Sequence, residues 1–505
     1  MKNLLLTLDA GTSACKAEVF THTGKSIASH SVPYQIYSPS PGYAELDFSV
    51  LNSAVRIAVG RSIESINTSE LAGMAVSAQL GLAAIGSDGK LLGNILTWAD
   101  RRASDQAKLI EATFGLKKIY DVCGRRVSPE WPLAKILYYQ QHESERHAAT
   151  AKYLSLKDFL VYRLTGKFVT DPAHASYSLL YNVATQQWEQ EFIQAFKIMG
   201  DQLPDVFSAH SIAGHTWGEF SEELGLPEGT PVIVGGPDGS TGSLGAGLVS
   251  EQTTVNVAGT TDVVFKCSSE PVFDPFHGTI VNCYLIPGSW VSGGPMSTTG
   301  GCLQWFVQCF ADAEKKQASE QGVSVYEILD RQASQVSAGS EKLIAFPTLV
   351  GERTPFWEPE RRGSFLGLGP QHTKAHMYRA IMEGSAFSVR ALCERLDEQS
   401  GSADQVILAG GGAKSRLWTQ IRADIFGKPI RLPQTLEATN LGSALLAAVG
   451  LGLYSDFQEA AQEMIRMGPV VEPNQDNQSR YQDLYETFCE FHDVLGPASR
   501  TLADL

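Results

Sequence analysis

Two short hairpin-like units, about half a chain apart, constrain the fold more than any other feature of this sequence. Residues 4–20 contain an apolar run, the tight polar turn Asp-Ala-Gly-Thr-Ser and a second apolar run. Residues 253–265 repeat this arrangement around the turn Ala-Gly-Thr-Thr. Gly11 and Gly259 are 248 residues apart in a chain of 505. The repeat predicts two related halves, each opening with a β-hairpin whose turn contains Gly-Thr.

Strand and helix patterns alternate along the rest of the chain. Helical spacing is present in residues 103–114, 158–164 and 415–426. Residues 231–236 and 405–412 are apolar runs that end in glycines, a pattern typical of strands followed by turns. Because such alternation is typical of mixed α/β domains, we expect binding loops at the ends of strands.

A cluster of Gly, Ala and Ser over residues 245–251 marks the boundary between the two halves. We therefore predict an N-terminal domain over residues 1–247 and a C-terminal domain over residues 248–455. Residues 456–505 have helical spacing and lack glycine turns of the kind described above, which predicts a helical packing segment.

Composition narrows the classes of function. The net charge of −15 disfavours binding to phosphate backbones or anionic lipid, so we expect neither a nucleic-acid nor a membrane partner. The eight cysteines are scattered and include no Cys-x-x-Cys pair, which fits a reducing cytoplasm. The first apolar stretch ends at Asp9, too early for a signal peptide, and no run approaches about 18 apolar residues.

Two common nucleotide-binding motifs are not matched. Residues 24–26 (Gly-Lys-Ser) resemble the end of a P-loop, but Val19 stands where that motif requires glycine. No Gly-x-Gly-x-x-Gly motif opens a helix after a strand. A P-loop or Rossmann site is therefore disfavoured.

The first turn has two interpretations. Gly11 lets backbone amides approach an oxyanion, Thr12 and Ser13 add hydroxyl donors, and Asp9 is placed to hold Mg²⁺ through water. The alternative is an ordinary hairpin turn with a capping aspartate. The second turn, residues 259–261 (Gly-Thr-Thr), favours the phosphate interpretation, because two such turns facing each other can clasp a triphosphate from both sides.

Two glycine-rich stretches supply further candidates. Residues 410–413 (Gly-Gly-Gly-Ala) carry little side chain, so a flat base has room against the backbone there. Residues 235–239 (Gly-Gly-Pro-Asp-Gly) present Asp238 at the end of a buried strand. Asp238 either caps the following helix or acts as a general base towards a substrate hydroxyl, and the local sequence leaves both open.

The most specific pattern lies in the C-terminal half. Residues 363–368 (Gly-Ser-Phe-Leu-Gly-Leu) are followed after seven residues by 376–383 (His-Met-Tyr-Arg-Ala-Ile-Met-Glu), and Gly-Glu-Arg-Thr-Pro precedes them at 351–355. With these motifs the chain resembles the FGGY family of carbohydrate kinases from residue 4 to about residue 450. The resemblance implies an α/β chain with the two-domain actin-like ATPase (ribonuclease H-like) fold and a cleft between the domains.

Carried over by position, the resemblance assigns a role to each candidate residue. It implies a first turn for phosphate and Mg²⁺ (Asp9, Gly11, Thr12, Ser13 and Lys16, with Asp9 on the metal), a second phosphate turn (Gly259 and Thr260), an ATP pocket (Gly300, Gln304, Gly411, Gly412 and Ala413), a catalytic base that also faces the sugar (Asp238), and sugar-binding segments (Gln79, Trp98, Asp100 and Arg102).

The resemblance predicts an ATP-dependent kinase that phosphorylates a hydroxyl of a small sugar, with D-xylulose as the leading acceptor. Gly81 stands where xylulokinases have a sugar-contacting histidine, and Gly239 follows Asp238 as in gluconate-like members. Gluconate or another polyol or ketose is therefore the alternative within the family. An actin-like ATP switch and a sugar sensor without turnover are alternatives of other classes, and the sugar-side residues favour the kinase.

The same resemblance distributes these parts over the predicted domains. The first phosphate turn, the sugar-binding segments and Asp238 fall in residues 1–247, and the second turn with the adenine site falls in residues 248–455. ATP and Mg²⁺ are the implied cofactors, and a small-molecule sugar is the implied partner. Whether the chain forms a homodimer stays open.

Overall fold

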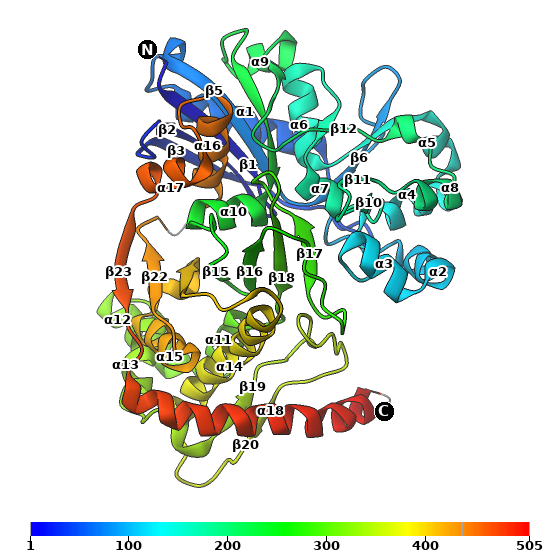
Figure 1. Cartoon of the computed structure of the whole chain (residues 1–505). Coiled ribbons are helices and arrows are strands. Elements are labelled where there is room, and N and C mark those ends of the chain that lie inside the picture. Colours follow the sequence, from blue (N-terminus) through cyan, green and yellow to red (C-terminus); the bar gives the residue numbers. More distant parts are fainter. Residues whose placement is uncertain (1, 436–437, 504–505) are drawn as a thin grey trace.

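Each half of the chain builds its own central sheet, and the two sheets lie in the two lobes of the computed structural model (Figure 1). The structure describes residues 2–435 and 438–503. In the first lobe six strands follow the order β13-β14-β5-β1-β2-β3. These strands are β1 (Leu4–Ala10), β2 (Ala14–Thr21), β3 (Ser26–Pro33), β5 (Leu71–Ala78), β13 (Ile212–His215) and β14 (Pro231–Pro237).

The sheet of the second lobe has the order β17-β18-β16-β15-β21-β22-β23. Its strands are β15 (Thr253–Ala258), β16 (Asp262–Ser268), β17 (Ile280–Cys283), β18 (Trp290–Pro295), β21 (Gln405–Ala409), β22 (Ile430–Pro433) and β23 (Met467–Val471). In the first lobe β1 pairs antiparallel with β2 and parallel with β5, and in the second lobe β15 does the same with β16 and β21. The predicted repeat of two hairpin-led halves is therefore confirmed.

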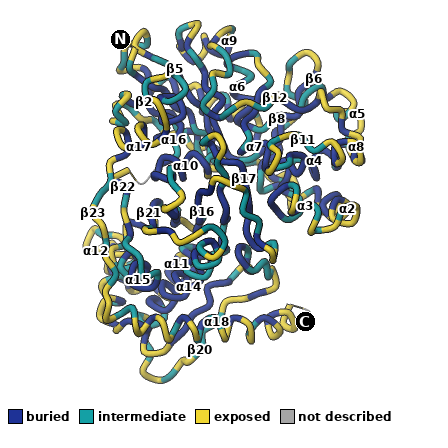
Figure 2. The backbone as a smooth tube through the Cα atoms, viewed as in Figure 1, coloured by how far each residue is buried: buried dark blue, intermediate teal, exposed yellow. Residues whose placement is uncertain are grey.

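The central strand β1 is buried on both faces, as its continuous apolar sequence indicates. Leu4, Leu6 and Leu8 belong to a core shared with helices α1 (Phe48–Ile63) and α6 (Leu156–Thr165). Leu5 faces the other way, into a core that contains helix α16 (Thr439–Gly450). Figure 2 shows these buried strands in the interior of both lobes, with exposed segments around them.

Helix α10 (Asp238–Ala246) crosses α16 in the middle of the molecule, where the two lobes meet (Figure 1). A Cβ atom on Gly442 of α16 would lie 1.8 Å from the carbonyl oxygen of Thr241, and one on Gly245 would lie 2.0 Å from that of Ala438. Only glycine at both positions allows this close approach. The crossing fixes the start of α10, and with it Asp238, beside the second lobe.

The three predicted helices are present with small shifts of their ends. Residues 103–114 form α2 (Ser104–Phe114), residues 158–164 lie in α6, and residues 415–426 form α15 (Arg416–Phe426). Ser415 caps α15 by accepting a hydrogen bond from the backbone of Trp418.

The C-terminal segment departs from the prediction of a wholly helical segment over residues 456–505. It contains α17 (Phe457–Met464) and α18 (Gln475–Ala503), but β23 lies between them and pairs antiparallel with β22. The stretch Met-Gly-Pro-Val-Val has no helical period, and its glycine, proline and two valines favour an edge strand. Helix α18 packs Tyr481 and Phe488 into the core of the second lobe.

The remaining elements are short connecting strands, helices of the first lobe and helices of the second lobe, one of which is 27 residues long. They are β4 (Glu45–Leu46), β6 (Gly81–Gly86), β7 (Ile95–Thr97), β8 (Thr150–Leu154), β9 (Val169–Thr170), β10 (Tyr181–Asn182), β11 (Gln187–Trp188), β12 (Asp205–Val206), β19 (Ile344–Phe346), β20 (Ser364–Leu366), α3 (Leu116–Cys123), α4 (Pro132–His142), α5 (Ser144–Ala149), α7 (Pro172–Ser176), α8 (Gln190–Ala195), α9 (Gly218–Glu223), α11 (Gly300–Phe310), α12 (Asp312–Gln321), α13 (Val325–Ala333), α14 (Lys374–Ser400) and the 3-10 turns Thr68–Glu70, Gly200–Gln202, Ser340–Lys342 and Gly411–Lys414. Among the described residues, no helix combines the length and apolar character needed to cross a bilayer.

Candidate active site

The carboxyl ends of three neighbouring parallel strands meet at the candidate site. Strands β1, β5 and β14 run parallel, and Asp9, Gln79 and Asp238 stand at their ends. Ligands of open α/β sheets bind outside the carboxyl ends of such strands. The topology thus brings together three residues that are far apart in the sequence and that the sequence analysis assigned to one site.

Asp9 and Asp238 are close enough to influence each other electrostatically. Burial and the charge of Asp238 raise the pKa of Asp9 to about 7, against the opposing effects of Ser77 and Lys16. The Ser77 hydroxyl donates a hydrogen bond of 2.8 Å to Asp9 Oδ1. Two carboxylates held together in this way are a natural place for a divalent cation, because its charge relieves their repulsion.

Asp238 is the first residue of α10, and Pro237 occupies the N-cap position. Asp238 is therefore not the N-cap residue that one interpretation of the sequence allowed. Its Oδ1 accepts a 2.7 Å hydrogen bond from the backbone of Gly239. Burial raises the pKa of Asp238, whereas that hydrogen bond and the charge of His174 lower it. His174, whose Nδ1 lies 2.9 Å from Asp171 Oδ2, escaped the sequence analysis because no motif marks it.

The first Gly-Thr turn is held by contacts to the sugar-side residues. Gln79 Nε2 donates a hydrogen bond of 3.2 Å to the carbonyl oxygen of Gly11, and the Thr12 hydroxyl lies 3.4 Å from Gln79 Oε1. The indole of Trp98 donates a 3.1 Å hydrogen bond to the Thr12 hydroxyl. Ser13, which is exposed, accepts a backbone hydrogen bond from Tyr34. Trp98 and Gln79 therefore lie against the first Gly-Thr turn, for which the sequence predicts phosphate binding.

Asp100 and Arg102 form a buried ion pair beneath this surface. Arg102 Nη2 lies 2.8 Å from Asp100 Oδ2 and 2.5 Å from Glu45 Oε1, and the Asp100 side chain is fully buried. The same Asp100 oxygen accepts a hydrogen bond from the backbone of Ala44, and the guanidinium lies 4.0 Å from the ring centre of Tyr43. These contacts engage both side chains within the protein, so a sugar contact for either stays a prediction.

Lys135 of α4 is buried beside these residues and provides a test of the local electrostatics. Its ammonium donates a 2.6 Å hydrogen bond to the carbonyl oxygen of Thr97, and burial lowers its pKa to about 7 despite Asp100 and Glu130. The unfolded chain therefore binds a proton that the folded chain releases above pH 7, so this group makes folding more favourable as the pH rises.

We expect the Lys135→Met variant to lose this pH dependence. Between pH 7 and pH 9 the free energy of unfolding of the wild type should rise by about 2–3 kcal/mol more than that of the variant. Urea denaturation of both proteins at the two pH values measures the difference. Equal pH dependence in the two proteins would show that Lys135 stays protonated in the fold.

A cavity of about 240 Å³ lies between the lobes at the first turn. It is lined by Asp9 and Lys16 from the first lobe and by residues of the crossing helices and the second sheet, namely Gly242, Val257, Ala409, Ala438, Thr439 and Asn440. The Lys16 ammonium lies 3.3 Å from Glu18 Oε2. Thr439 and Asn440 were missed because residues at a helix start have no periodic signal. Among the residues that the structure describes, the buried Asn440 Oδ1 has no hydrogen-bond partner.

A second cavity, of about 440 Å³, lies in the second lobe beyond the ends of strands β15 and β21. Six of the seven predicted ATP-pocket and second-turn positions line it, namely Gly259, Thr260, Gly300, Gln304, Gly411 and Gly412. Ala413 is buried beside them and does not line the cavity. A Cβ atom on Gly300 would lie 2.2 Å from the carbonyl oxygen of Gly259, so glycine permits the contact between the turn and α11.

Several other side chains of this cavity were not anticipated. They include Tyr326 and Asp330 of α13, Tyr378 of α14 and Trp418 of α15. Asp330 Oδ2 accepts a 2.7 Å hydrogen bond from the Ser415 hydroxyl. An isolated aspartate in an amphipathic helix has no local signature of a site, so only the packing of α13 against α14 and α15 reveals it.

The second turn rests on a buried polar network. Arg422 Nη1 lies 2.6 Å from Asp262 Oδ2, and both side chains are fully buried. Asp262 Oδ1 accepts a 2.8 Å hydrogen bond from the Thr299 hydroxyl, and Asn256 also contacts Arg422. Because Asp262 directly follows the turn and Thr299 directly precedes Gly300, the network ties the two backbone walls of the cavity together.

No ready-made metal cluster accompanies the two carboxylates. Across residues 2–435 and 438–503 there is no group of three or more His, Cys, Asp or Glu side chains arranged to hold an ion. Asp9, beside Asp238, suits Mg²⁺ because this ion keeps several waters and commonly takes its other ligands from substrate phosphates.

Comparisons with known proteins agree with this geometry. The family model of the FGGY carbohydrate kinases matches with its N-terminal domain at residues 4–245 and with its C-terminal domain at residues 254–451. The xylulose kinase of Staphylococcus epidermidis is 31% identical over 491 residues, which cover 97% of this chain and 96% of the relative. The gluconokinase of Bacillus subtilis is 28% identical and covers 100% of this chain and 98% of its own.

A solved structure shares the whole architecture. The crystal structure of gluconate kinase from Lactobacillus acidophilus superposes with a TM-score of 0.91 at 28% identity, covering 99% of both chains. The match confirms the predicted two-domain actin-like fold, and the family models together span most of the sequence. This chain belongs to the FGGY family of carbohydrate kinases and is a sugar kinase.

Proposed function

We propose that the protein transfers the γ-phosphoryl group of ATP to a hydroxyl of a small sugar, with D-xylulose as the leading acceptor. The observation that carries the proposal is the meeting of Asp9, Gln79 and Asp238 at neighbouring strand ends, beside a cavity that both lobes line. That arrangement supports a site in which a phosphate turn, a polar sugar-side residue and a base act on the same substrates.

The two Gly-Thr turns hold the nucleotide phosphates in this proposal. Backbone amides near Gly11 and Gly259 approach the phosphate oxygens, and Lys16 supplies positive charge in the smaller cavity. Asp9 would hold Mg²⁺, directly or through water, and the ion would supply positive charge beside the transferred group. The adenine lies against Gly411 and Gly412, in the cavity that also contains Trp418.

Asp238 orients the attacking hydroxyl and accepts its proton. Because phosphoryl transfer has a loose transition state, positioning and charge neutralisation contribute most to the rate. Burial raises the pKa of Asp238, and this makes the carboxylate a better proton acceptor than an exposed aspartate. In the same proposal residues 1–247 supply the acceptor site and the base, and residues 248–455 supply the adenine site.

The charges near Trp98 support a neutral acceptor. Arg102 is paired with Asp100 and Glu45, and Arg101 Nη2 lies 3.4 Å from Glu130 Oε2. Because both arginines already pair with carboxylates of the protein, neither is available to bind the carboxylate of an acceptor such as gluconate. A neutral ketose needs no such cation and is therefore favoured. Gluconate or another polyol stays the alternative, because a gluconokinase is among the relatives at 28% identity.

The test is an acceptor panel with Mg·ATP. ADP release is measured with D-xylulose, L-xylulose, D-ribulose, L-ribulose, gluconate, glycerol and erythritol, and we expect the highest kcat/KM for D-xylulose. A higher kcat/KM for gluconate would overturn the assignment of the acceptor and retain the kinase. Nucleotide binding without turnover on any acceptor would count against the proposed reaction.

A further inference from the structure

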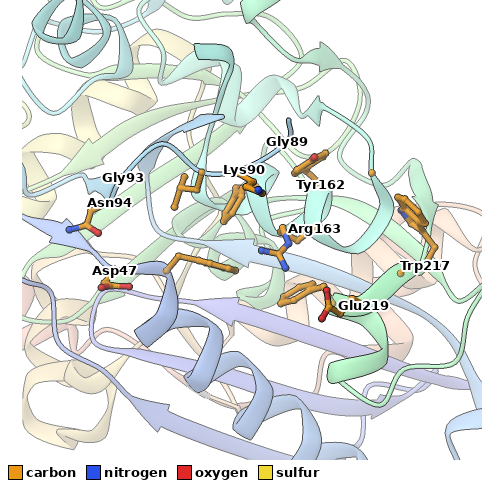
Figure 3. A pocket seen from close by; sticks show the side chains of 15 residues that line it. Asp47, Gly89, Lys90, Gly93, Asn94, Tyr162, Arg163, Trp217 and Glu219 are labelled. Atoms are coloured by element: carbon orange, nitrogen blue, oxygen red, sulfur yellow. The ribbon is translucent and has the colours of Figure 1, made fainter. Parts of the chain in front are cut away.

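The first lobe contains a pocket that the proposed reaction does not use. It has a volume of about 760 Å³, larger than either active-site cavity, and shares no lining residue with them. We call it the outer pocket, and Figure 3 shows its side chains. It lies between the start of α1, the turn after β6, helix α6 and the start of α9, and is lined by Asp47, Phe48, Gly89, Lys90, Leu91, Gly93, Asn94, Phe159, Tyr162, Arg163, Gly166, Trp217, Gly218, Glu219 and Phe220.

Two glycines allow its walls to come together. A Cβ atom on Gly89 would lie 2.1 Å from the hydroxyl of Tyr162, and one on Gly166 would lie 3.0 Å from the indole of Trp217. Both glycines have a positive φ, of 76° and 71°. The turn after β6 and the chain before α9 therefore close on α6 at positions where a larger residue would push them away.

The floor of the outer pocket combines aromatic rings with a cation. The Arg163 guanidinium lies 4.9 Å from the ring centre of Phe48 and 4.7 Å from that of Phe220. In the described part of the chain, no carboxylate oxygen lies within 4.0 Å of Arg163. The rings orient the guanidinium without consuming its five hydrogen-bond donors, which leaves them available to an anionic ligand.

The other charged side chains of the pocket differ in how free they are to contact a ligand. Asp47 caps α1 and accepts 2.7 Å hydrogen bonds from the backbone and the hydroxyl of Ser49. Lys90 is 83% exposed and lies 3.5 Å from Asp88, a loose surface pair that a ligand can replace. Figure 3 shows Lys90, Arg163 and Glu219 among the lining side chains, with Trp217 at one side. Trp217 is 57% exposed, so part of its aromatic surface is accessible to a ligand.

We propose that the outer pocket binds a planar aromatic anion of about nucleoside-monophosphate size. The ring stacks against exposed aromatic surface at Trp217, the anionic group pairs with Arg163 and Lys90, and Glu219 accepts a hydrogen bond from an amino group of the ring. The volume lies within the range of about 300–1,000 Å³ that is usual for small-molecule sites. The inference is independent of the acceptor sugar, because no residue of the pocket belongs to the active site.

Calorimetric titration of the full chain with AMP tests the proposal. Saturating ADP with Mg²⁺ is present throughout, so that the nucleotide cavity is occupied. We expect AMP to bind at least about tenfold more tightly than either of two partial compounds. Adenosine lacks the phosphate, and ribose 5-phosphate lacks the aromatic base. Equal affinities for the three compounds, or no binding of AMP, would overturn the proposal.

Variants locate the binding. Arg163→Gln and Lys90→Gln should each weaken AMP binding, by about tenfold or more for Arg163, while leaving kcat for the sugar unchanged. Lys90 is so exposed that its replacement leaves the fold intact. Arg61→Gln, in the last turn of α1 and outside the pocket, is the matched control and should bind as the wild type does. Unchanged AMP affinity in both pocket variants would place the binding elsewhere and refute the site.

Discussion

The Asp238→Asn variant is expected to lose about 100-fold or more in turnover while still binding the sugar. Asparagine keeps the size and most of the hydrogen bonding of the side chain, but it cannot accept the proton of the attacking hydroxyl. The loss should appear in kcat with little change in sugar affinity, because the interaction removed is one that matters in the transition state. Steady-state ADP release and equilibrium sugar binding measure the two quantities.

A matched variant separates this effect from a general loss of charge. Asp105→Asn changes an aspartate whose side chain is 87% exposed on α2, and it should leave kcat unchanged. The folded state of Asp238→Asn is checked by its thermal unfolding, which should occur at or above the wild-type temperature. The reason is that removing one of two repelling carboxylates relieves strain on Asp9. Turnover of Asp238→Asn near that of the wild type would remove Asp238 from the role of base.

Local sequence predicts those parts of the site that depend on turns, helix caps and strand ends within a short segment of chain. The turn around Gly11 follows from an apolar run that meets Asp-Ala-Gly-Thr-Ser, and the helix after Ser415 follows from a capping residue before an amphipathic stretch. Asp238 could be selected as a candidate because glycines surround a single carboxylate at the end of a β-strand, and its role as a base stays a prediction. Each of these patterns lies within about a dozen residues.

The parts that sequence could not supply depend on pairing between distant segments. Nothing local to Met467–Val471 shows that it completes the second sheet, because its partner β22 determines that role. Nothing local to Gly245 or Gly442 shows that two helices meet there, because the need for glycine arises only where α10 and α16 cross. Asp100 carries a sugar-site pattern, yet only the three-dimensional structure shows that it shares the guanidinium of Arg102 with the distant Glu45.

The second large effect, a loss of folding stability, is expected when Arg422 is replaced, because its role is structural. Arg422→Met leaves Asp262 buried without its ion-pair partner, and breaking such a pair typically costs about 3–5 kcal/mol. Urea denaturation should show a loss of this size in the free energy of unfolding. The control is Lys117→Met, because Lys117 pairs with Asp121 on the surface and its loss should cost less than about 1 kcal/mol.

A double variant shows whether this network also positions the nucleotide. Asp262→Asn combined with Arg422→Met removes both charges, so stability should recover in part, since no unpaired buried charge remains. If the network serves only the fold, the KM for ATP should recover with stability. We expect it to stay raised, because Arg422 no longer holds the side chain at position 262 in place for the hydrogen bond from Thr299, which joins the second Gly-Thr turn to the wall at Gly300. A KM for ATP equal to that of the wild type in the double variant would limit the role of the pair to stability.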